Sequence, residues 1–242
     1  MKKTVFIAFS ALLTWAACKP STKNTQETPA QDTQAATTPV VEQPVDTAGQ
    51  KEQLVEITTA AGKIVLKLYN ETPQHRDNFI KLVKDGYYTD LLFHRVIKGF
   101  MIQGGDPDSK TAKAGQQLGA GDIGYTIPAE INNKLIHKKG ALAAARTENP
   151  EKRSSGCQFY IVQGQHTNPD DLQNMAYYRG YQYTPEQLKA YEKGGAPSLD
   201  GQYTVFGEVV SGLNVVDAIA NQSVDGFSRP FGDIRFTIKL KD

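Results

Sequence analysis

The sequence predicts a mainly β domain built around a closed, eight-stranded antiparallel barrel. Eight segments after residue 53 combine apolar and β-branched side chains in short runs bounded by turn residues. Only two other segments have the spacing of core helices, and they do not alternate regularly with the strands, which disfavours a parallel doubly wound sheet. Eight antiparallel strands suit a closed barrel, because closure removes exposed edges. The order of the elements also allows a two-sheet sandwich.

The strands begin with a hairpin. Residues 54–59 and 63–69 alternate apolar and polar side chains on either side of a short turn, and residues 234–240 show the same alternation at the end of the chain. A strand with one face buried has this period of two residues. Five shorter segments complete the set of strands: residues 92–97, 100–103, 141–145, 158–163 and 204–210.

The two core helices are predicted from their ends and their apolar faces. The first opens at Pro73, since proline is favoured in the first helical turn, and stops at Gly86. Its core face would carry Phe79, Leu82 and Val83. The second covers residues 212–220, and its core face would carry Leu213, Val216 and Ile219.

Residues 166–197 interrupt the strand pattern and predict a helical insertion on the surface. One helix is expected over residues 169–178. A second begins at the capping box of Thr184 and Gln187 and ends at Gly194. Long connections of this kind are usually functional or mobile. The sequence leaves open whether the insertion is a decoration of the fold or a site for a partner.

The first 17 residues are interpreted as a lipoprotein signal peptide. Two lysines precede an apolar run over residues 5–13, which is too short to span a bilayer, and small residues follow at Ala16 and Ala17. Cys18 then resembles the lipidated cysteine of bacterial lipoproteins, although Trp15 stands where that motif usually has Leu. The alternative is an ordinary secreted protein in which this cysteine has no special role.

The next segment predicts a tether, and the domain follows it. Cys18 and the residues up to 53 hold four prolines and no aromatic residue, Leu or Ile, so this stretch is expected to be disordered. Residues 54–242 are long enough for one sizeable core. The remaining cysteine, Cys157, lies in an apolar segment and is expected to be buried, which would protect a lone thiol in an oxidising compartment.

Composition and local motifs exclude several classes of function. The chain of 242 residues has 27 Lys and Arg against 26 Asp and Glu, so its charge of +1 gives no electrostatic reason to expect nucleic-acid binding. Residues 119–124 match G-x-G-x-x-G, but Pro128 follows where a dinucleotide site needs a helix. The four histidines lack metal-ligand spacing. We therefore expect neither a metal nor a cofactor.

The segment with the most chemistry is residues 93–106, FHRVIKGFMIQGGD. It places a cation, Arg95, and an amide, Gln103, on two adjacent strands that a turn at Lys98 and Gly99 could pair. Large apolar residues, Phe100 and Met101, lie between them. Taken alone, this pattern also fits a barrel hairpin with one exposed arginine and ordinary core residues.

Four stretches in order resemble cyclophilins, the β-barrel peptidyl-prolyl isomerases: residues 93–106, 140–145 (GALAAA), 156–161 (GCQFYI) and 199–207 (LDGQYTVFG). The resemblance covers nearly all of residues 54–242 except the insertion. It implies an eight-stranded barrel capped by two helices. It also implies an enzyme that rotates X–Pro peptide bonds without a cofactor.

The resemblance assigns roles residue by residue. Arg95 matches the catalytic arginine, and Gln103 matches the glutamine that holds the substrate backbone. The proline pocket would be formed by Phe100, Met101, Tyr160 and Leu199, with Tyr160 standing where the family usually has Phe. Ala145 and Gln158 match positions in the peptide groove.

Four further positions depart from the family pattern. Arg146 and Thr147 replace the usual Asn-Ala beside the groove, which puts the backbone contacts there in doubt. Tyr203 replaces a frequent His in the substrate-binding set. Ser198 stands where many eukaryotic members have the tryptophan that contacts cyclosporin, which suggests weak binding of that drug.

The combined expectation is an exported isomerase. Its partners would be Pro-containing segments of exported proteins, whose folding it would assist. We expect a monomer held by lipidated Cys18 on a bacterial cell-envelope membrane, facing the periplasm from the outer membrane. The alternative is a chaperone or assembly module that binds Pro-containing segments with little turnover.

Overall fold

A computed structural model describes residues 51–241. The predicted signal peptide (residues 1–17), the lipidated Cys18 and nearly all of the predicted tether (residues 18–53) lie outside the described residues. No helix within residues 51–241 is both long and apolar enough to span a membrane.

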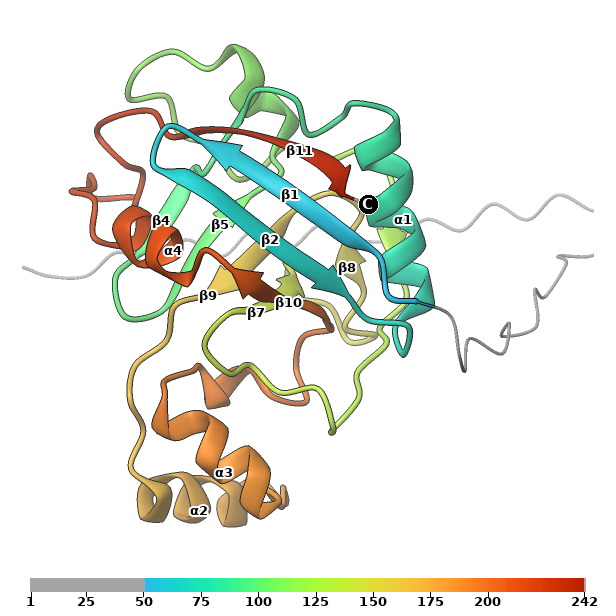
Figure 1. Ribbon diagram of the computed structural model, residues 1–242, viewed down its shortest axis with the longest axis vertical. Helices are drawn as coiled ribbons and strands as arrows, with labels where there is room; N and C mark the ends of the chain where they lie inside the picture. The colour runs from blue at the N-terminus through green and yellow to red at the C-terminus, as the bar shows by residue number, and fades with distance from the viewer. Residues whose placement is uncertain (1–50, 242) are drawn as a thin grey trace, which may run out of the picture. The chain divides into compact units, whose positions relative to one another are not determined.

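A single antiparallel sheet of nine strands forms the body of the domain (Figure 1). From one edge to the other its strands are β3 (Leu91–Leu92), β11 (Arg235–Lys241), β1 (Leu54–Thr59), β2 (Gly62–Leu68), β10 (Val205–Ser211), β7 (Ala141–Ala144), β9 (Phe159–Val162), β5 (Met101–Gly104) and β4 (Arg95–Ile97). A separate pair, β6 (Thr126–Ile127) and β8 (Ser154–Ser155), forms a small second sheet.

The sheet curls round so that one stretch of chain provides both of its edges. Only Phe93 and His94 separate β3 from β4. The Phe93 N–H donates to the Ile234 carbonyl on the β11 side, and the His94 N–H donates to the Gln103 carbonyl on the β5 side, both at 3.0 Å. The single strand predicted over residues 92–97 is therefore two short strands around a bend. This bend accounts for nine strands where eight were predicted, and a two-sheet sandwich is excluded.

Helices α1 (Pro73–Lys84) and α4 (Leu213–Ala220) lie at opposite ends of the curled sheet (Figure 1). Both were predicted. Phe79, Leu82 and Val83 are buried as expected. On α4 one expectation was wrong: the buried face is formed by Val215, Val216, Ile219 and Ala220, and Leu213 is 37% exposed. Leu213 is the first residue after the Gly212 cap, where the chain enters from the surface.

The apolar core lies inside the curl. Side chains from β1, β2, β5, β7, β9 and β11 form one cluster with α1 and α4. Cys157 belongs to this cluster, and burial raises the pKa of its thiol. The predicted burial of Cys157 is thus confirmed.

The insertion is helical, as predicted, and projects from the lower end of the domain in Figure 1. It contains α2 (Pro169–Tyr178) and α3 (Pro185–Glu192). The capping box of Thr184 and Gln187 is present at the start of α3. Leu172 and Tyr191 pack with Ile136 in a small core of their own. Two short 3-10 helices, η1 (Pro107–Thr111) and η2 (Pro197–Leu199), complete the described elements.

Candidate active site

The hairpin of β4 and β5 places a cation opposite an amide. Arg95 pairs with Gln103 in the register, and the predicted turn at Lys98 and Gly99 joins the two strands. Gly99 has φ +75°, a conformation that favours glycine. The exposed Arg95 guanidinium donates from Nη1 to Gln103 Oε1 at 3.2 Å. No carboxylate lies within ion-pair distance of Arg95 in the described part of the chain, so its charge stays available for a ligand.

Gln158 orients Gln103 from the neighbouring strand region. Gln103 Nε2 donates to Gln158 Oε1 at 3.0 Å. Gln158 Nε2 in turn donates to the carbonyls of Gly119 and Gly121, at 3.0 and 2.7 Å. The N–H groups of the same two glycines donate to the buried Asp106 carboxylate. The glycine-rich loop is therefore held from both sides, and Gln103 presents its amide in a fixed orientation.

An apolar pocket lies beside the guanidinium in a cavity of about 550 Å³. Its floor is formed by Met101 and Tyr160, which are 1% and 4% exposed. Phe100, Leu199 and Tyr203 are partly buried and pack around this floor. Tyr203 meets Tyr160 edge to face, with ring centroids 5.9 Å apart. A wall of this kind suits a small aliphatic ring, such as that of proline.

A second cavity of about 440 Å³ adjoins the first and shares Gln103 and Ala145 with it. Gln158 and Thr147 line it, whereas Arg146 lines both cavities. The Arg146 guanidinium lies 4.6 Å from the centroid of the Tyr203 ring, and its Nε donates to the Gln202 carbonyl at 3.0 Å. The two departures at 146 and 203 thus contact each other. The nine predicted catalytic and substrate-binding residues lie together around these two cavities.

His94 adds an unusual electrostatic feature to the pocket. It lines the first cavity, is buried, and neither ring nitrogen has a hydrogen-bond partner among the described residues. Burial lowers the pKa of His94 to about 4, although the nearby Asp106 charge opposes this shift. His94 is therefore neutral at pH 7. A neutral His94 adds no positive charge to the cavity, which Arg95, Arg146 and Arg229 already line.

Some residues of the pocket were not predicted from the sequence. These are His94, the segment 117–120, and the opposite wall with Asp225, Phe227 and Arg229. Phe227 is largely exposed at the rim. The only local signal was the G-x-G-x-x-G match at residues 119–124, which we did not interpret as a dinucleotide site. The structure places β6 after it. No group of three His, Cys, Asp or Glu side chains that could hold a metal occurs in residues 51–241.

The fold and site define a curled antiparallel β-protein whose surface cavity pairs a free guanidinium with an apolar pocket. Residues 54–239 match the family model of the cyclophilin type peptidyl-prolyl cis-trans isomerase/CLD. A peptidyl-prolyl cis-trans isomerase of Staphylococcus aureus (strain USA300) is 35% identical over 187 residues, which cover 76% of this chain and 89% of the relative. One of Staphylococcus haemolyticus is 34% identical over 183 residues, 74% of this chain and 86% of the relative.

Solved structures agree with this result. A cyclophilin type isomerase of Cryptosporidium parvum matches with a TM-score of 0.59 and 25% identity, over 79% of this chain and 99% of that chain. A second structure of that protein, in the presence of the dipeptide Ala-Pro, matches with a TM-score of 0.57 at 25% identity, over 78% and 99% of the two chains. The chain belongs to the cyclophilin-type peptidyl-prolyl cis-trans isomerases.

Proposed function

We propose that Arg95 is the catalytic residue of this isomerase and that Gln103 holds the substrate backbone. The observation that carries this proposal is the position of the Arg95 guanidinium beside an apolar pocket in the same cavity. A guanidinium with no carboxylate partner among the described residues can turn its donors toward a bound peptide. The pocket formed by Phe100, Met101, Tyr160 and Leu199 would hold the prolyl ring, with Tyr203 at its side.

The chemistry of X–Pro rotation explains why a cation and a pocket are sufficient. Amide resonance creates a barrier of about 18–20 kcal/mol. In the twisted transition state this resonance is broken, and the lone pair becomes localised on the prolyl nitrogen. Arg95 can donate a hydrogen bond to that nitrogen much better in the twisted state than in the planar state. Only such differential binding lowers the barrier.

The remaining residues fix one side of the rotating bond. The Gln103 amide, oriented by Gln158, can hydrogen-bond a peptide group, while the pocket grips the ring. Ala145 lines both cavities, and its small side chain leaves room for an extended peptide to pass from one cavity to the other. Removal of water from the pocket strengthens the donor from Arg95, because the local dielectric constant falls.

We also propose that the substrates are Pro-containing segments of exported proteins, whose folding the enzyme assists. The Ala-Pro dipeptide named with the C. parvum structure supports Pro-containing substrates. The pattern of residues 1–53 supports export and a lipid on Cys18. In this proposal the lipid holds the domain, as a monomer, on the periplasmic side of a bacterial outer membrane. Labelling with palmitate tests the anchor: wild type should incorporate label and Cys18→Ala should not, whereas equal labelling would contradict it.

The isomerase itself is tested by NMR exchange spectroscopy on a short Ala-Pro peptide. We expect catalytic amounts of the protein to produce cis–trans exchange peaks on a timescale of seconds or faster, where the uncatalysed reaction takes tens of seconds or more. Line broadening from binding without accelerated exchange would instead indicate a module that binds Pro-containing segments. Arg146→Asn and Thr147→Ala, which restore the residues usual in the family, would then be the first substitutions to test for a gain of turnover.

A further inference from the structure

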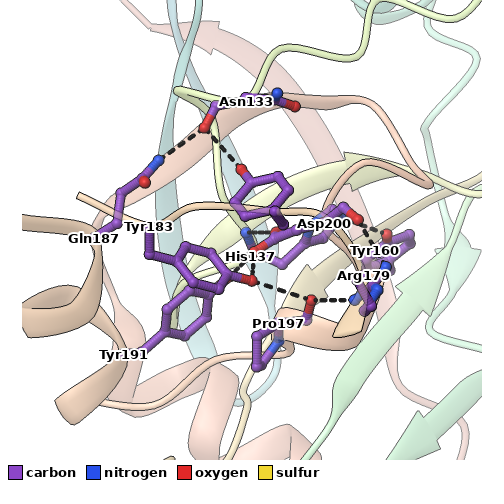
Figure 2. A network of polar contacts seen from close by, with 10 residues as sticks. Asn133, His137, Tyr160, Arg179, Tyr183, Gln187, Tyr191, Pro197 and Asp200 are labelled. Atoms are coloured by element: carbon purple, nitrogen blue, oxygen red, sulfur yellow. Dashed lines mark hydrogen bonds and ion pairs between the residues drawn. The ribbon is translucent and has the colours of Figure 1, made fainter. Parts of the chain in front are cut away.

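A buried polar network connects the helical insertion to the floor of the proline pocket (Figure 2). Its centre is Asp200, which follows η2. Asp200 Oδ1 accepts hydrogen bonds from the His137 backbone N–H and from His137 Nδ1, both at 2.8 Å. Asp200 Oδ2 accepts from the hydroxyl of Tyr183 at 2.7 Å and from that of Tyr191. Tyr191 lies on α3, and Tyr183 precedes Thr184, the residue that caps that helix.

Four donors surround the Asp200 carboxylate and satisfy its oxygens in the interior of the protein. Asp200 is only 3% exposed, and His137 and Tyr191 are fully buried. A buried carboxylate is costly unless its oxygens are satisfied, and here each oxygen accepts two hydrogen bonds. Burial and the Asp200 charge raise the pKa of Tyr183 and of Tyr191, so both hydroxyls keep the protons that they donate.

The network fixes the orientation of Tyr160. Nδ1 of the His137 ring is taken up by Asp200, which leaves the other ring nitrogen, Nε2, for a second partner. The Tyr160 hydroxyl forms a hydrogen bond of 3.0 Å with that Nε2. The His137 and Tyr160 rings are also stacked, with an angle of 13° between their planes. The ring of Tyr160 is therefore held at its far end while its face forms part of the pocket floor.

The insertion also holds a second wall of the pocket. Arg179, at the C-terminal end of α2, donates from Nη1 to the Pro197 carbonyl at 3.1 Å and from Nη2 to the Asp200 carbonyl at 3.0 Å. These two carbonyls flank Leu199, which lines the first cavity. One guanidinium thus fixes the backbone on both sides of a pocket residue.

We propose that the insertion is a positioning element of the active site: Tyr183 and Tyr191 hold Asp200, and Asp200 acts through His137 to fix Tyr160 in the proline pocket. This inference rests on the proposed function of that pocket. None of the four residues behind Tyr160 reaches the substrate. They set how tightly the groove binds the prolyl residue, so their loss raises KM and leaves kcat nearly unchanged.

The test is a double-mutant cycle in the full chain, with KM and kcat measured by exchange NMR on the Ala-Pro peptide. Tyr183→Phe removes one donor to Asp200. Tyr181→Phe is the matched control, because Tyr181 lies in the same insertion and, among the described residues, its hydroxyl donates only to the Asn133 carbonyl, at 2.9 Å. We expect Tyr183→Phe to raise KM about three- to tenfold, the effect of one buried hydrogen bond. Tyr181→Phe should leave KM unchanged.

Tyr160→Phe removes the hydrogen bond between Tyr160 and His137, through which the network reaches the pocket. Tyr183→Phe should therefore change KM much less in the Tyr160→Phe background than in wild type. The inference would be overturned if Tyr183→Phe raised KM by the same factor in wild type and in Tyr160→Phe. It would also be overturned if Tyr183→Phe and Tyr181→Phe changed KM equally. Arg179→Gln provides an independent route: acting through Leu199, it should raise KM in both backgrounds, and an unchanged KM would contradict the role of the insertion. If wild type shows no turnover, the proposed function fails, and the same cycle measured as the Kd of the peptide still decides the positioning role.

Discussion

Gln158→Glu tests whether the hydrogen bonds around Gln103 run in the direction that the structure shows. The substitution is nearly isosteric, but it replaces a donor with an acceptor. In wild type the Gln158 amide donates to the Gly119 and Gly121 carbonyls at 3.0 and 2.7 Å. An ionised glutamate would instead place a carboxylate oxygen against two carbonyl oxygens at a site that is only 8% exposed.

The expected cost depends on pH. Two lost hydrogen bonds cost about 1 kcal/mol each, and the poorly solvated charge adds at least a similar amount, which gives about 3 kcal/mol at pH 7. Burial raises the folded-state pKa of the new carboxyl above its unfolded value. The variant therefore loses relative stability as pH rises through that pKa. Near pH 4 a protonated glutamate can still donate to one carbonyl, so the deficit should fall to about 1 kcal/mol.

Urea unfolding of the variant and wild type at pH 4 and pH 7 measures both values. Gln116→Glu is the matched control: this exposed side chain only accepts a hydrogen bond, from the Lys113 N–H, so the change should be nearly neutral. Gln158→Glu should also lower kcat/KM at least tenfold, because Gln103 is no longer oriented. If Gln158→Glu had the stability and activity of wild type at both pH values, the hydrogen-bond directions described around Gln103 would be wrong.

Two further predictions concern the pocket. Phe100→Ala should raise KM for the Ala-Pro peptide at least tenfold, yet lower the free energy of unfolding by only about 1–2 kcal/mol, because the ring is partly exposed. Met101→Ala removes a fully buried side chain and should lower the free energy of unfolding by about 2–5 kcal/mol. Urea unfolding of both variants and wild type compares the two values. The free energy of unfolding should fall by about 3 kcal/mol between pH 6.5 and 4, because unfolded His94 binds a proton in this window and the folded form, with its pKa near 4, does not. His94→Gln should abolish this component, and an unchanged pH dependence would contradict it.

The strands and the two core helices could be predicted because their signals are local. Alternation identified β1, β2 and β11, and Pro73 and Gly86 marked the ends of the first helix. The strands β6 and β8 were missed because each is only two residues long and is held by one partner. The break between β3 and β4 was missed because Phe93 continues the apolar run and neither Phe93 nor His94 is a typical turn residue. Only the partners on either side show that the chain bends there.

The site could be predicted only where a motif carried it. The positions of Arg95, Phe100, Met101 and Gln103 followed from one hairpin and its resemblance to a family. The network at Asp200 could not be predicted, because His137, Tyr160 and Tyr183 are far apart in the sequence and carry no periodic signal. Phe100 shows a further limit: the pattern alone fitted an ordinary core aromatic as well as a pocket residue, and only the structure shows the partly buried ring lining the cavity.

The most direct measurement is the exchange rate of the Ala-Pro peptide with wild type, Arg95→Ala and Arg95→Lys at equal concentrations. The proposed mechanism predicts that Arg95→Ala folds normally, since the Arg95 side chain is exposed and forms one hydrogen bond within residues 51–241, yet loses about 10²–10³-fold in kcat. Arg95→Lys should recover little of this loss, because an ammonium lacks the fixed fork of donors. An Arg95→Ala variant that exchanges the peptide as fast as wild type would contradict the mechanism.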